Sequence, residues 1–488
     1  MTDDTTLVIF GASGDLTSRL LLPALGQLLT HEPGRRVHLR GVAMELWDDQ
    51  KWHDVVRSAF ASADADADAD AERAGGADAA RTLGSVVSSS YRSADITKAD
   101  DLAAVLEDTL GRIVLYFAVP PAVAAAACEA LTNVTVPAGT IIALEKPFGV
   151  DEASAHSLNE TLARIVPENQ IFRVDHFLGR STTLNLLGAR FANRLLEPVW
   201  SAEHIESVVI RYDETLGLEG RAGYYDRAGA LVDMLQSHLL QVLAVLTMEP
   251  PATLGEVDLR DATGAALRAT RIWADDPVRS SRRARYAAGN VQSTAVTAYV
   301  DEPGVDPARD TESLAEVTCE VSTSRWAGVP ITLRSGKAIG ARHTEIVICF
   351  RPVRHLPAGF TGSADGSVLR FTLGPDVMSL ELNINGPADP FELDRVALDA
   401  DLGPGQLLAY GEVLSGILDG DASLAVRGDA AEQCWRIVQP VLDAWREGKV
   451  ALDEYPAGTG GPAHWPRLPG SAVPHHRPST AHGEARGD

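Results

Sequence analysis

The sequence predicts an α/β domain with a parallel, doubly wound sheet, followed by a larger α+β domain with a mostly antiparallel sheet. In about the first 174 residues, short apolar runs alternate with helical patterns, which favours a parallel sheet covered on both faces. From about residue 175, longer runs alternate apolar with polar residues, which is typical of half-buried antiparallel strands. A chain of 488 residues also exceeds one ordinary domain. We therefore divide it into residues 1–174, residues 175–462 and a flexible tail at residues 463–488.

The first region begins with a short apolar run that stops at Gly11, as a buried parallel strand would. A leucine-rich stretch with helical periodicity follows it. A later alanine-rich segment has the composition of a helix and separates two further apolar runs. In chain order we predict strand 6–10, helix 16–29, strand 37–42, strand 113–119, helix 122–131 and strand 140–144.

In the second region the predicted strands are runs in which apolar residues recur at alternate positions. Such strands bury one face and expose the other to a second layer or to solvent. The predicted strands are residues 207–212, 316–322, 344–350, 367–373 and 378–384.

Two segments are predicted to lie outside both cores. Residues 63–70 alternate alanine and aspartate and have no apolar face, so we predict a solvated insertion, with a functional acidic patch as the alternative. After Gly461 the chain is rich in Pro, His and Gly, which is typical of a flexible tail. His475 and His476 in that tail could ligate a metal, but the composition favours solvated side chains, and we predict no metal site.

The charge of the chain restricts its partners. The formal net charge of −24 argues against binding to nucleic acid or to an anionic membrane. An anionic substrate would therefore need a locally basic pocket. A cluster of Lys, Arg and His is therefore a candidate site for binding an anionic substrate.

The cysteines and the N-terminal residues favour a cytoplasmic protein. The cysteines lie far apart without a C-x-x-C pair, so neither a disulfide framework nor a zinc site is indicated. The N-terminus enters an apolar strand without a basic leader, and no apolar run approaches membrane-spanning length. We therefore expect a reducing compartment and no membrane contact. The four cysteines are Cys128, Cys319, Cys349 and Cys434.

Residues 172–180 (FRVDHFLGR) place a carboxylate, an imidazole and a guanidinium close together in apolar surroundings. Asp175 can orient an imidazole or shift its pKa, and His176 with Arg180 can hold an anion such as a phosphate. The alternative is the end of a strand with a solvated, charged edge. The residues alone leave both interpretations open.

This stretch resembles the RIDHYLGK signature of glucose-6-phosphate dehydrogenases, and further blocks of that family follow in the family's order. The resemblance extends from about residue 5 to about residue 462, and it implies the two-domain organisation predicted above. The other blocks are GASGDL at 11–16, EKPFG at 145–149, GRAGYYD at 220–226, DMLQSH at 233–238, and RWAGVP at 325–330 running into RSGK at 334–337.

The turn between the first strand and the first helix is a candidate dinucleotide loop in a Rossmann-like domain. Glycines there allow a tight turn, and backbone amides at a helix N-terminus can hold a pyrophosphate. The third glycine of the common fingerprint is absent, but the resemblance implies NADP or NAD binding by this variant. The predicted residues are Gly11, Ala12, Ser13, Gly14, Asp15 and Leu16.

The end of the second strand bears on the choice between the two cofactors. Where many NADP-using family members have an arginine, this chain has Met44, followed by Glu45. An acid at this place accepts from a free ribose 2′-hydroxyl and repels a 2′-phosphate. We therefore hypothesise that NAD is used at least as readily as NADP, although Arg19 and Arg40 could support NADP.

The resemblance also implies the catalytic pair. Oxidising a sugar C1 hydroxyl requires a base for the hydroxyl proton while hydride passes to the nicotinamide. His238 lies in a helical pattern and matches the family's general base, and Asp175 matches the carboxylate that orients it. On its residues alone, His238 could equally cap a helix or fill the core.

The remaining binding residues follow from the same blocks. His176 matches the family's phosphate-binding histidine, and Lys146 matches a lysine that reaches both substrate and cofactor. Glu214 and Asp233 match acids that accept from sugar hydroxyls, and Lys337 matches a further substrate lysine.

Several matched positions carry a different residue in this chain. Phe177 and Arg180 replace a tyrosine and a lysine, and Arg342 replaces a lysine beyond Lys337. The tyrosine's phosphate donor is therefore lost, while each arginine keeps its charge and adds a planar fork suited to oxyanions. Ser18 and Leu20 replace two lysines near the N-terminus, one of which helps to bridge cofactor and substrate in typical members.

These residues lead to a cytoplasmic enzyme that oxidises glucose 6-phosphate to its 1,5-lactone with NADP or NAD, the first step of the pentose phosphate pathway. One alternative is the same chemistry on another 6-phosphorylated or 6-sulfonated hexose. Another is a catalytically weak NAD(P)-binding regulator. The resemblance also implies a homodimer or homotetramer formed through the large sheet.

Overall fold

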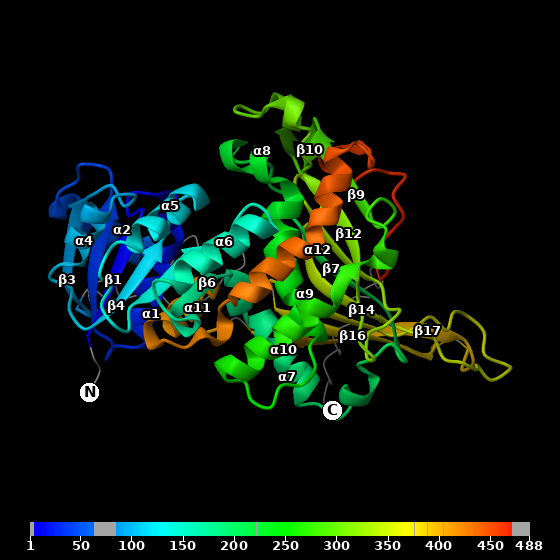
Figure 1. The fold of residues 1–488 in the computed structure, drawn as a ribbon. Coiled ribbons are helices and arrows are strands. Elements are labelled where there is room, and N and C mark those ends of the chain that lie inside the picture. Colours follow the sequence, from blue (N-terminus) through cyan, green and yellow to red (C-terminus); the bar gives the residue numbers. More distant parts are fainter. Residues whose placement is uncertain are drawn as a thin grey trace, which may run out of the picture.

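A computed structural model describes residues 4–62, 84–220, 222–374, 376–387, 389–403 and 405–470. In these residues two large sheets of different kinds lie side by side (Figure 1). The predicted insertion at 63–70 and the pair His475 and His476 lie outside the described residues.

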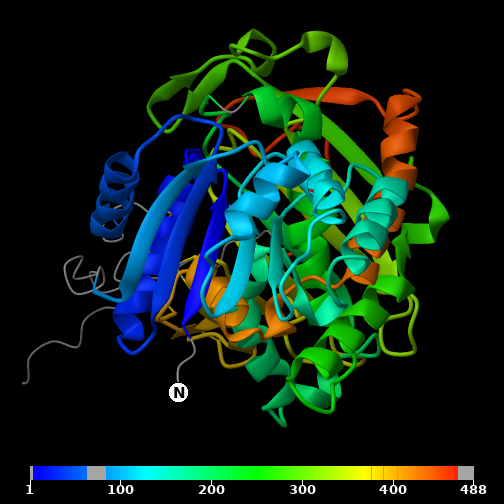
Figure 2. The same cartoon turned by 60° about the vertical axis from the view of Figure 1, so that its left-hand side comes forward.

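The first sheet has six parallel strands in the order β3-β2-β1-β4-β5-β6. Every residue of the first strand is buried, because helices cover both faces of the sheet (Figure 2). This confirms the doubly wound parallel sheet. Its strands are β1 (Thr5–Phe10), β2 (Val37–Ala43), β3 (Val86–Ser93), β4 (Arg112–Phe117), β5 (Ile141–Glu145) and β6 (Ile171–Val174). Its helices are η1 (Thr17–Leu21), α1 (Leu22–His31), α2 (Asp49–Ser62), α4 (Ala99–Leu106), α5 (Pro121–Leu131) and α6 (Glu152–Ala163).

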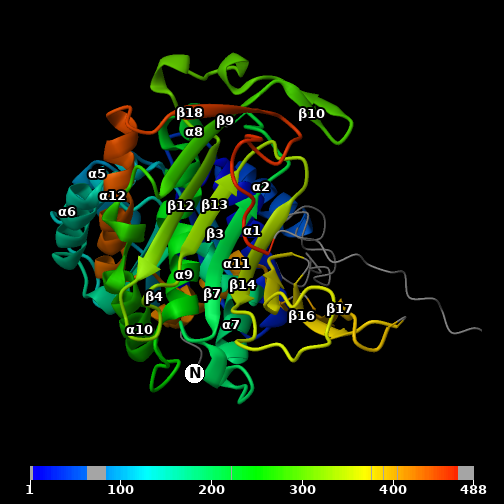
Figure 3. The same cartoon turned by 90° about the vertical axis from the view of Figure 1, so that its right-hand side faces the viewer.

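The second sheet has ten strands and is mostly antiparallel, as predicted, with two parallel pairs, β7 with β13 and β9 with β18. Figure 3 shows this sheet with helices behind it. Its strands are β7 (Ile205–Asp213), β8 (Thr270–Ile272), β9 (Ser281–Ala287), β12 (Leu314–Val321), β13 (Ile331–Gly336), β14 (His343–Phe350), β15 (Val368–Thr372), β16 (Val377–Asn385), β17 (Leu393–Asp401) and β18 (Leu452–Pro456). A separate hairpin consists of β10 (Gly289–Val291) and β11 (Thr294–Val296).

The helices of the second region pack on one face of the large sheet and between the two sheets (Figure 1). They are α7 (Ser181–Phe191), α8 (Ala222–Ala230), η5 (Leu231–Leu239), α9 (Leu240–Thr247), α10 (Glu256–Ala269), α11 (Ala409–Asp419) and α12 (Gly428–Arg446). Short 3₁₀ turns complete the fold: η2 (Glu168–Gln170), η3 (His176–Gly179), η4 (Glu197–Val199), η6 (Trp273–Asp275), η7 (Tyr299–Asp301), η8 (Pro307–Arg309) and η9 (Ala422–Leu424).

Strand β7 illustrates how the sequence pattern places side chains. Val208, Ile210 and Tyr212 point into the main core, whereas Val209 between them packs in a small cluster on the opposite face. Leu468 from the end of the described chain covers that small cluster. The alternation therefore presents every second β7 residue to the helices that carry the candidate site.

The predicted division at residue 174 stays a prediction, and one late helix bears on it. Val413, Leu414 and Ile417 of α11 pack in the same core cluster as Leu7 and Leu22 of the first region. A segment more than two hundred residues beyond residue 174 therefore completes the core beside the parallel sheet.

The helical stretch Ala222–Thr247, which comprises α8, η5 and α9 and is kinked at Gly229 (φ 68°, ψ 172°), is long and apolar enough to cross a membrane by length and composition alone. No apolar run of that length was expected from the sequence. Because 89% of its most apolar window is buried inside the structure, this helix has the surroundings of a core helix.

Candidate active site

The candidate dinucleotide loop lies at the carboxyl edge of the parallel sheet, where open α/β sheets bind ligands. Gly11 has φ +83°, and a Cβ there would lie 2.2 Å from the carbonyl oxygen of Ala118, so the turn requires glycine. The Gly11 amide donates to the Val42 carbonyl at 2.8 Å, and the Gly14 amide donates to the Gly11 carbonyl at 3.0 Å. The loop therefore runs close to the ends of β2 and β4 and leads into η1, a backbone that fits a pyrophosphate.

An acidic side chain stands beside this loop. Ser13 Oγ donates to Glu45 Oε2 at 2.6 Å, and this hydrogen bond lowers the pKa of Glu45 below its usual value. Met44 is 73% exposed. An ionised carboxylate is therefore held at the end of β2.

The basic residues that could support a 2′-phosphate are placed differently. The Arg40 guanidinium donates to the Val105 and Glu107 carbonyls, at 2.5 and 2.9 Å, at the end of α4. Arg19 lies on η1 and is exposed. Arg40 is thus engaged by backbone carbonyls of α4, while Glu45 contacts the loop directly.

The predicted catalytic pair forms a direct contact between two distant segments. Asp175 follows β6, His238 lies in η5, and His238 Nδ1 is 2.5 Å from Asp175 Oδ1. Ser237 Oγ donates to Asp175 Oδ2 at 2.5 Å, and the Phe177 amide donates to Oδ1 at 3.0 Å. The Asp175 side chain is 0% exposed and that of His238 is 2% exposed. Asp175 is therefore no solvated edge of a strand, and its oxygens hold the imidazole in one orientation.

The electrostatics of the pair define the tautomer. Burial opposes the charge on Asp175, but the His238 imidazole, the hydrogen bonds and His176 together hold its pKa well below the usual value. Burial lowers the pKa of His238, against the opposing effect of Asp175. An ionised Asp175 must accept from Nδ1–H, so a neutral His238 has Nε2 as its proton acceptor.

His176 belongs to the same cluster of rings. Its centroid lies 4.8 Å from that of His238 in an edge-to-face arrangement, and its ring stacks on Tyr410 of α11 at 5.2 Å. Burial, followed by the charges of His238 and Arg180, lowers the pKa of His176 well below its usual value. A neutral His176 can still donate one hydrogen bond to an oxyanion.

The predicted sugar-binding charges pair with each other. Lys146, directly after β5, donates to the main-chain oxygen of Asp233 and to its Oδ1, the latter at 3.1 Å. Lys337 Nζ lies 2.7 Å from Glu214 Oε2. Burial opposes both charges of the first pair, yet attraction to Asp233 raises the pKa of Lys146, and Lys146 together with Lys337 lowers the pKa of Asp233 to about 2. A polyhydroxylated substrate would replace these contacts by its own.

The two arginines at variant positions have different surroundings. The Arg180 guanidinium carbon lies 4.4 Å from the centroid of the Phe177 ring, and that ring stacks on His238 at 4.2 Å. Arg342 is exposed in the loop before β14. The structure therefore places Arg180 one ring away from the predicted catalytic pair and leaves Arg342 at the surface.

Sequence reasoning missed the tyrosines around Glu145. Burial raises the pKa of Glu145 to about 7, and its carboxylate accepts from Tyr116 Oη at 2.6 Å and from Tyr410 Oη at 3.5 Å. Tyr410 reaches this place only because α11 docks beside the first sheet. Ser237, which donates to Asp175, has one signal in the sequence, namely its position directly before His238.

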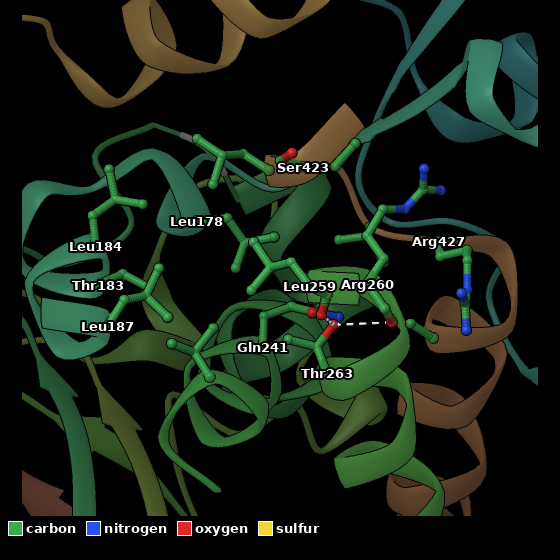
Figure 4. Close-up of a pocket in the computed structure, with 15 residues that line it drawn as sticks. Leu178, Thr183, Leu184, Leu187, Gln241, Leu259, Arg260, Thr263, Ser423 and Arg427 are labelled. Carbon is green, nitrogen blue, oxygen red and sulfur yellow. Dashed lines mark hydrogen bonds between the residues drawn. The ribbon is translucent and has the colours of Figure 1, made fainter. Parts of the chain in front are cut away.

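A small cavity is lined by residues of α7, α9, α10 and the segment before α12 (Figure 4). Leu178 and Gln241 line it, each a few residues from a member of the catalytic pair, together with Thr183 and Arg260. Its volume of about 30 Å³ suits one or two water molecules and excludes a sugar. Within the described parts of the chain, no three His, Cys, Asp or Glu side chains gather as metal ligands would.

Comparisons with known proteins show the family of this chain. Residues 8–185 match the family model "Glucose-6-phosphate dehydrogenase, NAD binding domain", and residues 187–472 match "Glucose-6-phosphate dehydrogenase, C-terminal domain". A glucose-6-phosphate 1-dehydrogenase of Gluconobacter oxydans is 37% identical over 93% of this chain and 94% of its own length. One from Mycolicibacterium smegmatis is 35% identical over 94% of each chain.

Solved structures give the same result. The crystal structure of glucose-6-phosphate 1-dehydrogenase from Mycobacterium avium has a TM-score of 0.81 and 31% identity, and covers 95% of this chain and 96% of its own. A glucose-6-phosphate dehydrogenase in complex with its substrate glucose-6-phosphate has a TM-score of 0.80 and 27% identity, over 95% and 97% of the two chains.

Proposed function

This chain belongs to the glucose-6-phosphate dehydrogenase family, and on that premise we propose that it oxidises glucose 6-phosphate at C1 to 6-phosphoglucono-1,5-lactone. NADP or NAD is the hydride acceptor, and the reaction is the first step of the pentose phosphate pathway. The observation that carries the proposal is the 2.5 Å contact between His238 Nδ1 and Asp175 Oδ1.

In the proposed mechanism, His238 Nε2 removes the proton of the C1 hydroxyl. The C1–H bond breaks at the same time and its electron pair leaves with hydrogen as hydride, so that C1 becomes the lactone carbonyl. The bound nicotinamide supplies the hydride acceptor. Asp175 remains ionised and steadies the imidazolium that forms.

The proposed binding roles follow the charges at the site. The glycine loop holds the cofactor, and Lys146 contacts substrate and cofactor. The ring hydroxyls of the sugar bind to Glu214, Asp233 and Lys337. These hydrogen bonds replace the ion pairs that Glu214 forms with Lys337 and that Asp233 forms with Lys146. His176, Arg180 and Arg342 take the phosphate. In this scheme Arg342 must approach the substrate from the surface.

The substrate assignment is tested by reduced-nicotinamide absorbance with a panel of hexoses. The two arginines that replace lysines would also suit another 6-phosphorylated or a 6-sulfonated hexose. We expect kcat/KM to be highest for glucose 6-phosphate, by about tenfold or more over any other sugar. If kcat/KM is higher for another 6-phosphorylated or 6-sulfonated hexose, that sugar is the substrate and the assignment of glucose 6-phosphate is wrong. Binding of cofactor by calorimetry without turnover of any sugar would instead favour a regulator.

A second prediction concerns the cofactor. Because Glu45 places a carboxylate beside the loop while Arg40 is engaged elsewhere, we expect NAD to be used at least as readily as NADP. Steady-state kinetics and calorimetric titration with each cofactor measure this. Glu45→Gln, which removes the charge, should strengthen NADP binding more than NAD binding. A preference of the wild type for NADP of about a hundredfold would contradict the prediction.

We further propose a cytoplasmic homodimer or homotetramer that assembles through the large sheet. Three exposed apolar side chains on the outer two strands of this sheet and the turn between them lie where such an interface would cover them. They are Ile384 on β16, Leu398 on β17 and Phe391 between these strands.

A further inference from the structure

The guanidinium of Arg180 is held by two aromatic side chains from different parts of the chain. Its Nη2 donates to the hydroxyl of Tyr212 at 3.3 Å. Its carbon lies 4.4 Å from the Phe177 ring centroid and 5.6 Å from that of Tyr212. The centroids of the Phe177 and Tyr212 rings are 5.2 Å apart. A planar cation fixed in this way is oriented before any substrate arrives.

Strand β7 sets the direction of Tyr212. Tyr212 faces the helices together with Val208 and Ile210, and the next residue on that side is Glu214, just past the end of the strand. Glu214 is proposed above for a ring hydroxyl of the sugar. Glu214 and Tyr212 are two residues apart on the same face of the strand, which corresponds to about 7 Å. The proposed contact to a ring hydroxyl therefore lies close to the pair formed by Tyr212 and Arg180.

Phe177 links this pair to the proposed base. The same phenyl ring that contacts Arg180 stacks on the His238 imidazole with an interplanar angle of 15°. The cation and the base are thus separated by one aromatic ring. A hexose whose C1 faces His238 can direct its C6 substituent towards Arg180.

We propose that the Tyr212 hydroxyl, together with Arg180, binds the phosphate group of the substrate. This inference rests on the proposed function and adds to it a residue that the family signature does not contain. A phosphate monoester needs several donors, and a phenol that accepts from a guanidinium can donate its own proton to an oxyanion. Phe177 has no hydroxyl to offer, and Tyr212 supplies one on the neighbouring ring.

Tyr212→Phe tests this role, because it removes one oxygen atom from a side chain that is 7% exposed and keeps the ring. We expect KM for glucose 6-phosphate and the inhibition constant of inorganic phosphate, which probes the same subsite, each to rise about tenfold or more. We expect kcat and the KM of the cofactor to stay within about twofold, because Tyr212 does not touch the reacting atoms.

The matched control is Tyr286→Phe, which deletes another buried phenol hydroxyl, bonded to Glu302 at 3.2 Å. It should leave both constants unchanged. The inference is overturned if Tyr212→Phe changes neither constant, or if it lowers kcat while both constants stay at the wild-type values. Failure of the wild type to turn over glucose 6-phosphate would instead refute the proposed function.

Discussion

Replacing His238 with alanine is expected to lower kcat for glucose 6-phosphate oxidation by at least about a thousandfold. The substitution removes the acceptor for the C1 hydroxyl proton, and hydride leaves an alcohol that keeps its proton far more slowly, because the product would be a high-energy protonated carbonyl. Reduced-nicotinamide absorbance at saturating substrate and cofactor measures the loss.

Two further variants separate loss of the base from loss of the fold. His238→Asn keeps a polar side chain within reach of Asp175 and should lose a comparable factor, because an amide cannot act as the base. His204→Ala changes a half-buried histidine in the turn before β7 and should retain wild-type kcat. A loss of less than tenfold in His238→Ala would remove His238 from the mechanism.

Asp175→Asn is expected to lower kcat by about a hundredfold or more with little change in the KM of the substrate. The introduced amide would no longer require a proton on His238 Nδ1 and would carry no charge to stabilise the imidazolium. Because Asp175 is 0% exposed and its two oxygens accept from Ser237, His238 and the Phe177 amide, it is a positioning residue. Ser237→Ala removes one donor to Asp175 and leaves the imidazole contact, so a smaller loss, about tenfold or less, is expected.

The pH profile distinguishes this role from a structural one. Asp175 raises the pKa of His238, against the lowering by burial. Removing the carboxylate therefore lowers the pKa of His238 further, and the acid limb of kcat/KM should move to lower pH in Asp175→Asn. An acid limb that stays at the wild-type position would show that the carboxylate does not act on the base.

Much of the parallel domain follows from local sequence. The runs at 6–10 and 37–42 are apolar because both faces of β1 and β2 are covered, and the predicted bounds differ from the observed ones by one residue at an end. The alternation at 207–212 predicts β7 for the complementary reason, namely that its two faces meet different surroundings. Apolar runs and alternation depend only on residues close together in the chain, so these strands can be predicted from the sequence directly.

The site depends on contacts that local patterns do not encode. The resemblance paired Asp175 with His238, but the π-helical geometry of η5 that carries His238 has no signal in the residues. Tyr410 and Tyr212 come from a late helix and from a sheet strand, and each reaches the site through docking of distant segments. The sequence also allows Arg40 as a ligand of a 2′-phosphate, because it does not reveal that this side chain turns to the carbonyls at the end of α4.

The interaction between His238 and Asp175 is tested most directly by the double variant Asp175→Asn, His238→Ala. If Asp175 acts only through the imidazole, the double variant should have the kcat of His238→Ala alone, within about threefold, because the carboxylate has no base left to orient. If the two losses multiply instead, Asp175 and His238 act independently, and the catalytic pair described here is wrong.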